Sequence, residues 1–156
     1  MDPDTFRAVL GRFASGVTVL TTRNGTTDLG MTVSSFCSLS LNPPLVLACV
    51  DRTADLHGQL AMGQRVVFNI LSAKQEALSR RFSEEDDSRR FDGIGFKRDR
   101  NGIVVLDDVV SAIEGSIVDQ HDGGDHSIFV AEVDGAASSD LRPLLYYRGG
   151  YAELER

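Results

Sequence analysis

The chain has 156 residues, of which 42% are apolar and 25% charged, so it is long enough for one well-packed domain and too short for two. Its formal net charge of -7 at pH 7 argues against nucleic acid as a general partner, because phosphate binding requires a concentrated basic surface. No apolar run approaches the roughly 20 residues of a membrane span, and the first residues lack the features of a secretory signal. We therefore expect a single cytoplasmic domain over residues 1–156 that binds neither nucleic acid nor membrane.

An amphipathic helix is expected at the N-terminus, because apolar residues recur there at the i, i+3, i+4, i+7 spacing of a helix. These residues are Phe6, Val9, Leu10 and Phe13. Asp2 or Asp4 would cap this helix. Pro3 suits its first turn, and Gly16 would end it.

Strands are expected next. Residues 17–22 (VTVLTT) are rich in β-branched side chains, and residues 29–36 (LGMTVSSF) follow a turn-prone segment, so the two predict a hairpin. Residues 45–50 (LVLACV) form a continuous apolar run that is typical of a buried strand. A short helix, capped by Thr53 or Asp55, would follow it.

The second half of the chain predicts more strands. Residues 65–71 (RVVFNIL) read as a strand, and a second amphipathic helix capped by Ser72 follows. Residues 83–101 form a long charged excursion, which in a compact domain is usually functional or mobile. Its acidic run 84–87, beside two arginines, is either a solvated face or a lid near a ligand. Four more strand-like segments complete the chain, at 102–106, 110–120, 126–136 and 143–149.

Short strands thus predominate, and no βα unit repeats. This pattern predicts a mainly β fold, a closed or nearly closed antiparallel barrel with two or three helices packed outside it.

One segment, residues 30–44 (GMTVSSFCSLSLNPP), lacks the alternation of an ordinary strand and carries many short hydroxyl side chains. Small residues let a flat ring approach the backbone, whose N–H and C=O groups can then pair with the ring edge. The turn at 51–55 (DRTAD) could meet a phosphate through N–H groups and Arg52, although an ordinary turn with a helix cap explains it equally well. Taken alone, these features suit a planar ligand with a phosphate tail.

Other motifs in the sequence are weaker indications of a functional site. His121, Asp125 and His126 have no second pair of ligands to complete a metal site, and a glycine-rich turn explains them equally well. The segment DGIGF lacks the third glycine of a dinucleotide-binding fingerprint. Cys37 and Cys49 have no C-x-x-C spacing, and a reducing compartment would leave them as free thiols. No metal site is therefore expected.

Five segments together resemble the flavin reductase family, the NAD(P)H-dependent components of two-component flavin monooxygenases. They are FRAVLGRFASGVTVLTT, GMTVSSFCSLSLNPPLVLACV, FNIL with the later LSRRF, HDGGDHSIFVAEV and PLLYYRGGY. They occur in this order between Phe6 and Tyr151. The resemblance implies an FMN-binding split barrel, which is an antiparallel Greek-key barrel with flanking helices. It also implies a homodimer with flavin in a groove near the subunit interface.

The resemblance assigns site residues as well. The flavin-binding set comprises Thr32, Val33, Ser34, Ser35, Phe36, Ser38, Leu39, Arg52, Thr53, Ala54, Asp55, Arg81 and Phe82. Within this set, residues 32–39 would line the ring and the start of the ribityl chain. Residues 52–55 would contact the phosphate side, and residues 81–82 would close over the flavin. The nicotinamide-binding set comprises His126, Tyr147 and Tyr151.

The activity implied is that of an NAD(P)H:flavin oxidoreductase, which passes a hydride from NADH or NADPH to FMN or FAD and supplies reduced flavin to a partner monooxygenase. Such a transfer depends on how two rings are positioned, so no catalytic acid or base is expected. The flavin would bind and leave in each cycle, as a substrate does. Two alternatives stay open: a non-enzymatic flavin carrier or electron-transfer protein on the same barrel, and an oxygenase or oxidase that retains its flavin.

Overall fold

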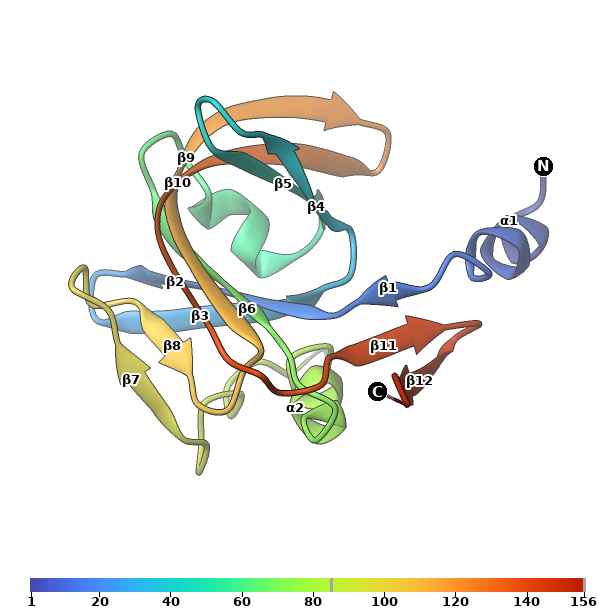
Figure 1. Cartoon of the computed structure of the whole chain (residues 1–156). Helices are drawn as coiled ribbons and strands as arrows, with labels where there is room; N and C mark the ends of the chain where they lie inside the picture. The colour runs from blue at the N-terminus through green and yellow to red at the C-terminus, as the bar shows by residue number, and fades with distance from the viewer. Residues whose placement is uncertain (85, 156) are drawn as a thin grey trace.

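The computed structural model describes residues 1–84 and 86–155, and strands form most of its regular structure (Figure 1). A seven-stranded antiparallel sheet has the order β3-β2-β6-β9-β10-β5-β4. Its strands are β2 (Thr18–Asn24), β3 (Thr27–Val33), β4 (Phe36–Ser40), β5 (Leu45–Asp51), β6 (Arg65–Ile70), β9 (Ser111–Gly123) and β10 (His126–Ser138). The mainly β, antiparallel prediction is confirmed.

Smaller elements surround this sheet. A three-stranded sheet has the order β1-β11-β12, and β7 pairs with β8 in a hairpin. These strands are β1 (Ser15–Gly16), β7 (Phe96–Arg98), β8 (Val104–Leu106), β11 (Leu144–Tyr147) and β12 (Gly150–Glu153). The helices are α1 (Pro3–Leu10), the 3-10 helix η1 (Asp55–Gln59) and α2 (Glu76–Arg81). Within the described residues, no helix has the length and apolar character that crossing a bilayer would require.

The large sheet must curl because its two edge strands are consecutive in the chain. In a flat sheet, β3 and β4 would lie six strand spacings apart, or about 29 Å. Only Ser34 and Ser35 join them, and a chain that runs from Val33 to Phe36 spans at most about 10 Å. The edges therefore meet where these two serines cross between them, and the barrel is split along this line.

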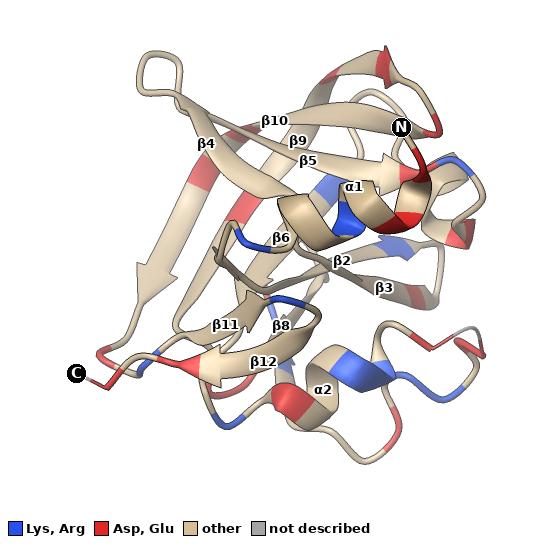
Figure 2. Ribbon diagram, turned by 90° about the vertical axis from the view of Figure 1, so that its right-hand side faces the viewer, with Lys and Arg blue, Asp and Glu red and all other residues tan. Residues whose placement is uncertain are grey.

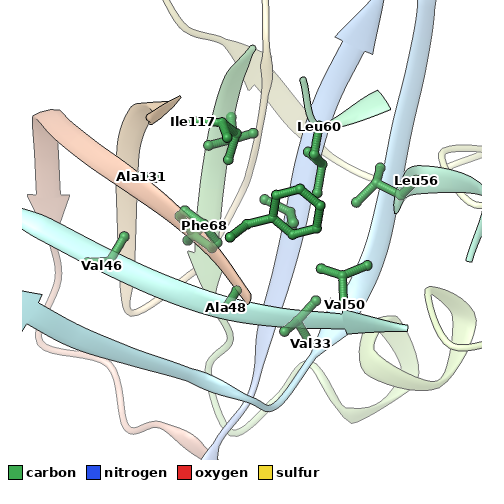
Figure 3. Close-up of a cluster of buried hydrophobic side chains, with 12 residues drawn as sticks. Val33, Val46, Ala48, Val50, Leu56, Leu60, Phe68, Ile117 and Ala131 are labelled. Carbon is green, nitrogen blue, oxygen red and sulfur yellow. The ribbon is translucent and has the colours of Figure 1, made fainter. Parts of the chain in front are cut away.

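The interior of the barrel holds the main hydrophobic core. β5 buries alternate residues, as expected of a strand with one face inward. Twelve residues form the cluster: Leu20, Val33, Val46, Ala48, Val50, Leu56, Leu60, Val66, Phe68, Ile117, Phe129 and Ala131. Figure 3 shows side chains of β3, β5, β6, β9, β10 and η1 pointing toward one another. Burying one large side chain such as Phe68 contributes about 1.5–3 kcal/mol.

A second core lies between the barrel and α2. It contains Val17, Val19, Leu71, Phe82, Val104, Leu106 and Leu144. The buried Asn69 ties β8 to this core, because its amide donates to Val19 O at 2.9 Å and its carbonyl accepts from Leu106 N–H at 2.9 Å. This packing fixes the end of α2 against the barrel.

Several predicted boundaries move in the structure. The N-terminal helix ends at Leu10 with Gly11 as its C-cap, and Gly16 lies in β1, whereas the Asp2 cap is confirmed by bonds from Asp4 N–H and Thr5 N–H. The hairpin strand expected to reach Phe36 stops at Val33, because the chain then crosses the split.

The other helices also begin differently. Neither Thr53 nor Asp55 caps η1, since its N-cap is Ala54 and Thr53 is bonded to Asp51. Ser72 is not the cap of α2: residues 72–75 form a turn in which the side-chain Oε1 of Gln75 accepts from Ser72 N–H, and the helix starts at Glu76. The charged excursion contains β7. Of its acidic run, residue 85 lies outside the described residues.

Candidate functional site

A cavity of about 790 Å³ opens between β3, the turn after β5 and the segment that follows α2. Its lining comes from residues 27–32, 51, 53–56, 82–84, 87–88 and 90–92. This volume lies within the range of about 300–1,000 Å³ that is usual for small-molecule sites. Five members of the predicted flavin-binding set line it: Thr32, Thr53, Ala54, Asp55 and Phe82.

The β3 wall is formed by close contact with Phe82. A Cβ added to Gly30 would lie 2.8 Å from a ring carbon of Phe82, so glycine is required for this approach. Thr32 donates its N–H to Phe82 O at 3.0 Å and its hydroxyl to Ser79 O at 2.7 Å. The C-terminal end of α2 is therefore anchored on β3, and the Thr32 hydroxyl proton is engaged within the protein.

Residues 33–39 of the segment with many hydroxyl side chains include both residues that pack in the core and residues that are exposed. Val33 is buried in the core, and the ring of Phe36 lies 5.0 Å from that of Phe68. Ser34 and Ser35 are exposed at the split of the barrel. Ser38 and Leu39 are exposed on β4, beside an irregularity in its pairing with β5. The Ser34 and Ser35 side chains are thus exposed at the split, although Ser35 O accepts from Cys49 N–H at 3.0 Å. Val33 and Phe36 pack in or against the core and hold the strands in place.

The turn after β5 is closed by its own side chains. The Asp51 carboxylate accepts from the Thr53 N–H at 2.8 Å and from the Thr53 hydroxyl at 2.7 Å. These bonds, the backbone one first, hold the pKa of Asp51 below its usual value. Arg52 points away from the cavity, because its Nε donates to Gly124 O at 2.9 Å and its Nη2 to Asp122 at 2.7 Å. The assignment of Arg52 to the phosphate stays a prediction, and this geometry favours another role.

The segment after α2 closes the cavity. In Figure 2, acidic and basic residues alternate along α2 and this segment. Arg81 donates to Asp92 O at 2.5 Å, and Arg90 donates to Gly30 O at 2.7 Å and to Glu84 O. Phe82 is buried, with its ring 5.1 Å from that of Phe91. Arg81 and Phe82 thus hold the segment that closes this side.

Arg90 lines this cavity and is absent from the set of site residues predicted from the sequence. Among the lining residues that the structure describes, it is the one basic side chain, beside six carboxylates. One of these, Asp28, is paired with Arg98 at 2.8 Å, and this hydrogen bond is the main cause that lowers the pKa of Asp28. The Nε of Arg90 is buried and has no partner. In the sequence, Arg90 was one arginine in a charged run, and only the fold shows that it reaches β3.

The predicted nicotinamide residues are divided between two hairpins, with His126 on β9–β10 and both Tyr147 and Tyr151 on β11–β12. His126 begins β10, is the pairing partner of Asp51, and has its Nδ1 2.7 Å from Asp125. Tyr151, on β12, bonds Ser79 Oγ through its hydroxyl at 2.8 Å, and its ring lies under Arg80. Tyr147 is exposed on β11. The structure therefore brings His126 to the 51–55 turn and brings Tyr151 to α2.

His57, on η1, has a specific contact with β10. Its Nε2 lies 2.8 Å from the hydroxyl of the fully buried Ser127, and its ring meets Phe129 edge-on. Cys37 and Cys49 are free thiols. In the described part of the chain, no group of three His, Cys, Asp or Glu side chains is arranged to hold a metal ion.

Comparisons with known proteins give one consistent result. The sequence model described as "Flavin reductase like domain" matches residues 10–155. The chain is 35% identical to the flavin-dependent monooxygenase reductase subunit HsaB of Mycobacterium tuberculosis, over 99% of this chain and 84% of that protein. It is 36% identical to the FMN reductase (NADH) SmoA of Agrobacterium fabrum, over 97% of this chain and 86% of that protein.

Solved structures agree in fold. The flavin reductase PheA2 superposes with a TM-score of 0.91 at 34% identity, covering 100% of both chains. The NADH:FAD oxidoreductase SgcE6 of Streptomyces globisporus, solved in complex with NAD and FAD fragments, has a TM-score of 0.93 at 33% identity. That match covers 98% of this chain and 93% of the other.

Proposed function

This chain belongs to the family of the flavin reductase-like domain, and we propose that it works as the reductase component of a two-component monooxygenase. It is an NAD(P)H:flavin oxidoreductase of the split-barrel type, and its substrates are a flavin and a nicotinamide nucleotide. The reduced flavin goes to a partner oxygenase, as in related reductase components.

The observation that carries this proposal is the cavity beside the split of the barrel. Three separate segments of the predicted flavin-binding set converge on it, from β3, from the 51–55 turn and from the end of α2. Its lining suits a flat heteroaromatic ring, since apolar side chains such as Leu29, Met31 and Phe82 lie beside threonine hydroxyls and backbone groups. We assign the flavin to this cavity and to the adjoining residues 34–39.

The chemistry that the two substrates supply is hydride transfer from nicotinamide C4 to flavin N5. The protein's residues bind and orient these rings, which requires stacking within reach and no proton transfer by a side chain. Phe82, held against Gly30, fixes the depth of the cavity. His126, next to the 51–55 turn, is assigned to the nicotinamide side, with Tyr147 and Tyr151 as further candidates. Short hydroxyls and backbone groups give exchangeable contacts, which suits a flavin that binds and leaves.

A homodimer in the cytoplasm is part of this proposal. The α1 helix has no buried residue, and Phe6, Val9, Leu10 and Phe13 are each more than half exposed, Phe13 at 82%. Figure 1 shows α1 projecting away from the barrel. Such an apolar helix face in a water-soluble protein requires a cover, and a second copy of the chain is our assignment.

The test is steady-state oxidation of NADH and of NADPH by the purified protein, each with FMN and with FAD. We expect nucleotide consumption that depends on added flavin in at least one of the four combinations. A protein that consumes neither nucleotide with either flavin would contradict the proposal. A yellow protein that retains its flavin through gel filtration and oxidises an organic substrate alone would instead support a flavin-retaining oxygenase.

A further inference from the structure

We propose that Arg52 is a positioning residue, which holds the turn between β9 and β10 against the 51–55 turn and so places His126 relative to the flavin. The inference rests on the proposed function, because it concerns the same site. It gives Arg52 a task on the nicotinamide side, in contrast to the phosphate contact that the sequence suggested.

Arg52 contacts three residues of that turn. Its backbone N–H donates to Asp125 O at 3.0 Å and its Nε to Gly124 O at 2.9 Å. Its Nη2 donates to the Asp122 carboxylate at 2.7 Å. One residue of the flavin-side turn therefore binds most of the length of the neighbouring turn.

The turn needs such support, because little else covers it. Residues 118–125 are all exposed, and Gly123 and Gly124 give its backbone wide conformational freedom. Figure 1 shows the β9–β10 ribbon at the top of the barrel, with this turn at its outer end. β5 pairs with β10 only as far as Asp51 opposite His126, and Arg52 continues the contact beyond that point.

His126 lies between Ser127, which is held in the barrel, and Asp125, which is held by Arg52. On the inner side, Ser127 is fully buried and bonded to His57 of η1. On the outer side, Asp125 O accepts from the backbone N–H of Arg52, and the Asp125 carboxylate lies 2.7 Å from Nδ1 of His126. Loss of the Arg52 side chain would remove its bonds to Gly124 O and to the Asp122 carboxylate, and only the backbone bond to Asp125 O would remain on the outer side. The turn would then loosen and the imidazole of His126 would change its placement, while the barrel stays folded.

The geometry also leaves Arg52 poorly suited to a flavin phosphate. Its side chain is outside the lining of the cavity, and its Nε and Nη2 already have acceptors. The Asp122 side chain is 89% exposed, so this charge pair itself adds little stability. The side-chain bond from Arg52 Nε to Gly124 O carries most of the effect, because the backbone bond to Asp125 O persists in every variant. This predicts that Asp122→Asn changes less than Arg52→Gln.

The experiment compares Arg52→Gln, Arg52→Lys and Asp122→Asn with the wild-type protein, using the nucleotide and flavin that the wild type uses best. For Arg52→Gln we expect the KM for the nucleotide to rise about five-fold, the scale of one charge-assisted hydrogen bond, with the Kd for flavin changed less than about two-fold. Arg52→Lys should recover part of the loss. Asp122→Asn should stay within about two-fold in both constants.

Arg65→Gln is the matched control, because Arg65 pairs with Asp134 on the same strand β10, far from the turn. It should leave the nucleotide KM unchanged. Amide hydrogen exchange gives a readout that needs no activity: residues 121–126 should exchange faster in Arg52→Gln and not in Arg65→Gln.

Two results would overturn the inference. A weaker flavin affinity with an unchanged nucleotide KM would make Arg52 a phosphate ligand. Unchanged KM and unchanged exchange at 121–126 would show that the turn does not depend on Arg52. Failure of the proposed function is a different result, absence of nucleotide oxidation by the wild type, and the exchange measurement still tests the contact of Arg52 with the turn in that case.

Discussion

Two walls of the cavity are held in different ways. The wall of β3 and α2 rests on buried groups: Phe82 is 1% exposed, and the Thr32 hydroxyl is bonded to Ser79 O. The wall formed by the 51–55 turn rests on exposed contacts, such as Arg52 with Asp122. Because buried packing and hydrogen bonds cost more to lose than exposed ion pairs, the first wall should govern stability and the second should govern substrate placement.

The largest effect is expected from Phe82→Ala. This change removes a buried ring that packs in the second core and against Phe91, so the free energy of unfolding should fall by about 3–5 kcal/mol. Flavin affinity should fall as well, because Phe82 lines the cavity. Urea denaturation measures the first effect, and a loss below about 1 kcal/mol would contradict the buried role of this wall.

Gly30→Ala should have the next largest effect. Its new methyl group would meet the Phe82 ring at 2.8 Å and the Phe91 ring at 3.1 Å, so overpacking should cost about 1–3 kcal/mol. Gly58→Ala is the control, since a Cβ there meets nothing within 4 Å. If the two variants have equal melting temperatures, the close approach of Phe82 to β3 is wrong.

Arg90→Gln tests the segment after α2, which closes the cavity between the two walls. It removes the bonds to Gly30 O and Glu84 O, so residues 86–92 should become more sensitive to protease and the Kd for flavin should rise about five-fold. Arg89→Gln is the matched control, because Arg89 is its exposed neighbour. Equal behaviour of the two variants in both assays would remove Arg90 from the site.

The smallest effect is expected at acid pH from Asp51→Asn. The Thr53 N–H and hydroxyl lower the pKa of Asp51, so this carboxylate stabilises the folded state above its unfolded pKa of about 4. That contribution is lost as the pH falls through the lower, folded pKa. The Tm of the wild type should therefore drop more steeply below about pH 4 than the Tm of Asp51→Asn. Parallel curves would show that the Asp51–Thr53 bonds do not stabilise this turn.

Local sequence patterns predicted much of the fold. The Asp2 cap and the buried strand at 45–50 follow from interactions among neighbouring residues, and both are present. β12 was missed because its residues, Gly150–Glu153, include no β-branched side chain, although Arg148 and Gly149, both at positive φ, make the tight turn before it. The break at Ser34 and Ser35 was missed because it follows from closure of the whole sheet, which no local pattern records.

In the candidate site too, local sequence patterns did not predict the contacts that depend on the tertiary fold. The resemblance to the flavin reductase family implied that residues 32–36, 38–39, 52–55 and 81–82 act together, and five of these residues do line one cavity. The direction of Arg52 and the reach of Arg90 depend on partners 70 and 60 residues away in the chain, so sequence reasoning could not supply them. Long side chains can turn toward several neighbours, and the tertiary fold decides which neighbour is present.

The most direct measurement of the central claim is anaerobic reduction of free flavin. A small amount of the purified protein is mixed with a large excess of FMN or FAD and of NADH or NADPH, and the reduced flavin formed per protein molecule is counted. The account predicts many turnovers, with flavin reduced in proportion to nucleotide oxidised. At most one equivalent of reduced flavin per protein would contradict it, because the protein would then be a flavin carrier or would retain its flavin.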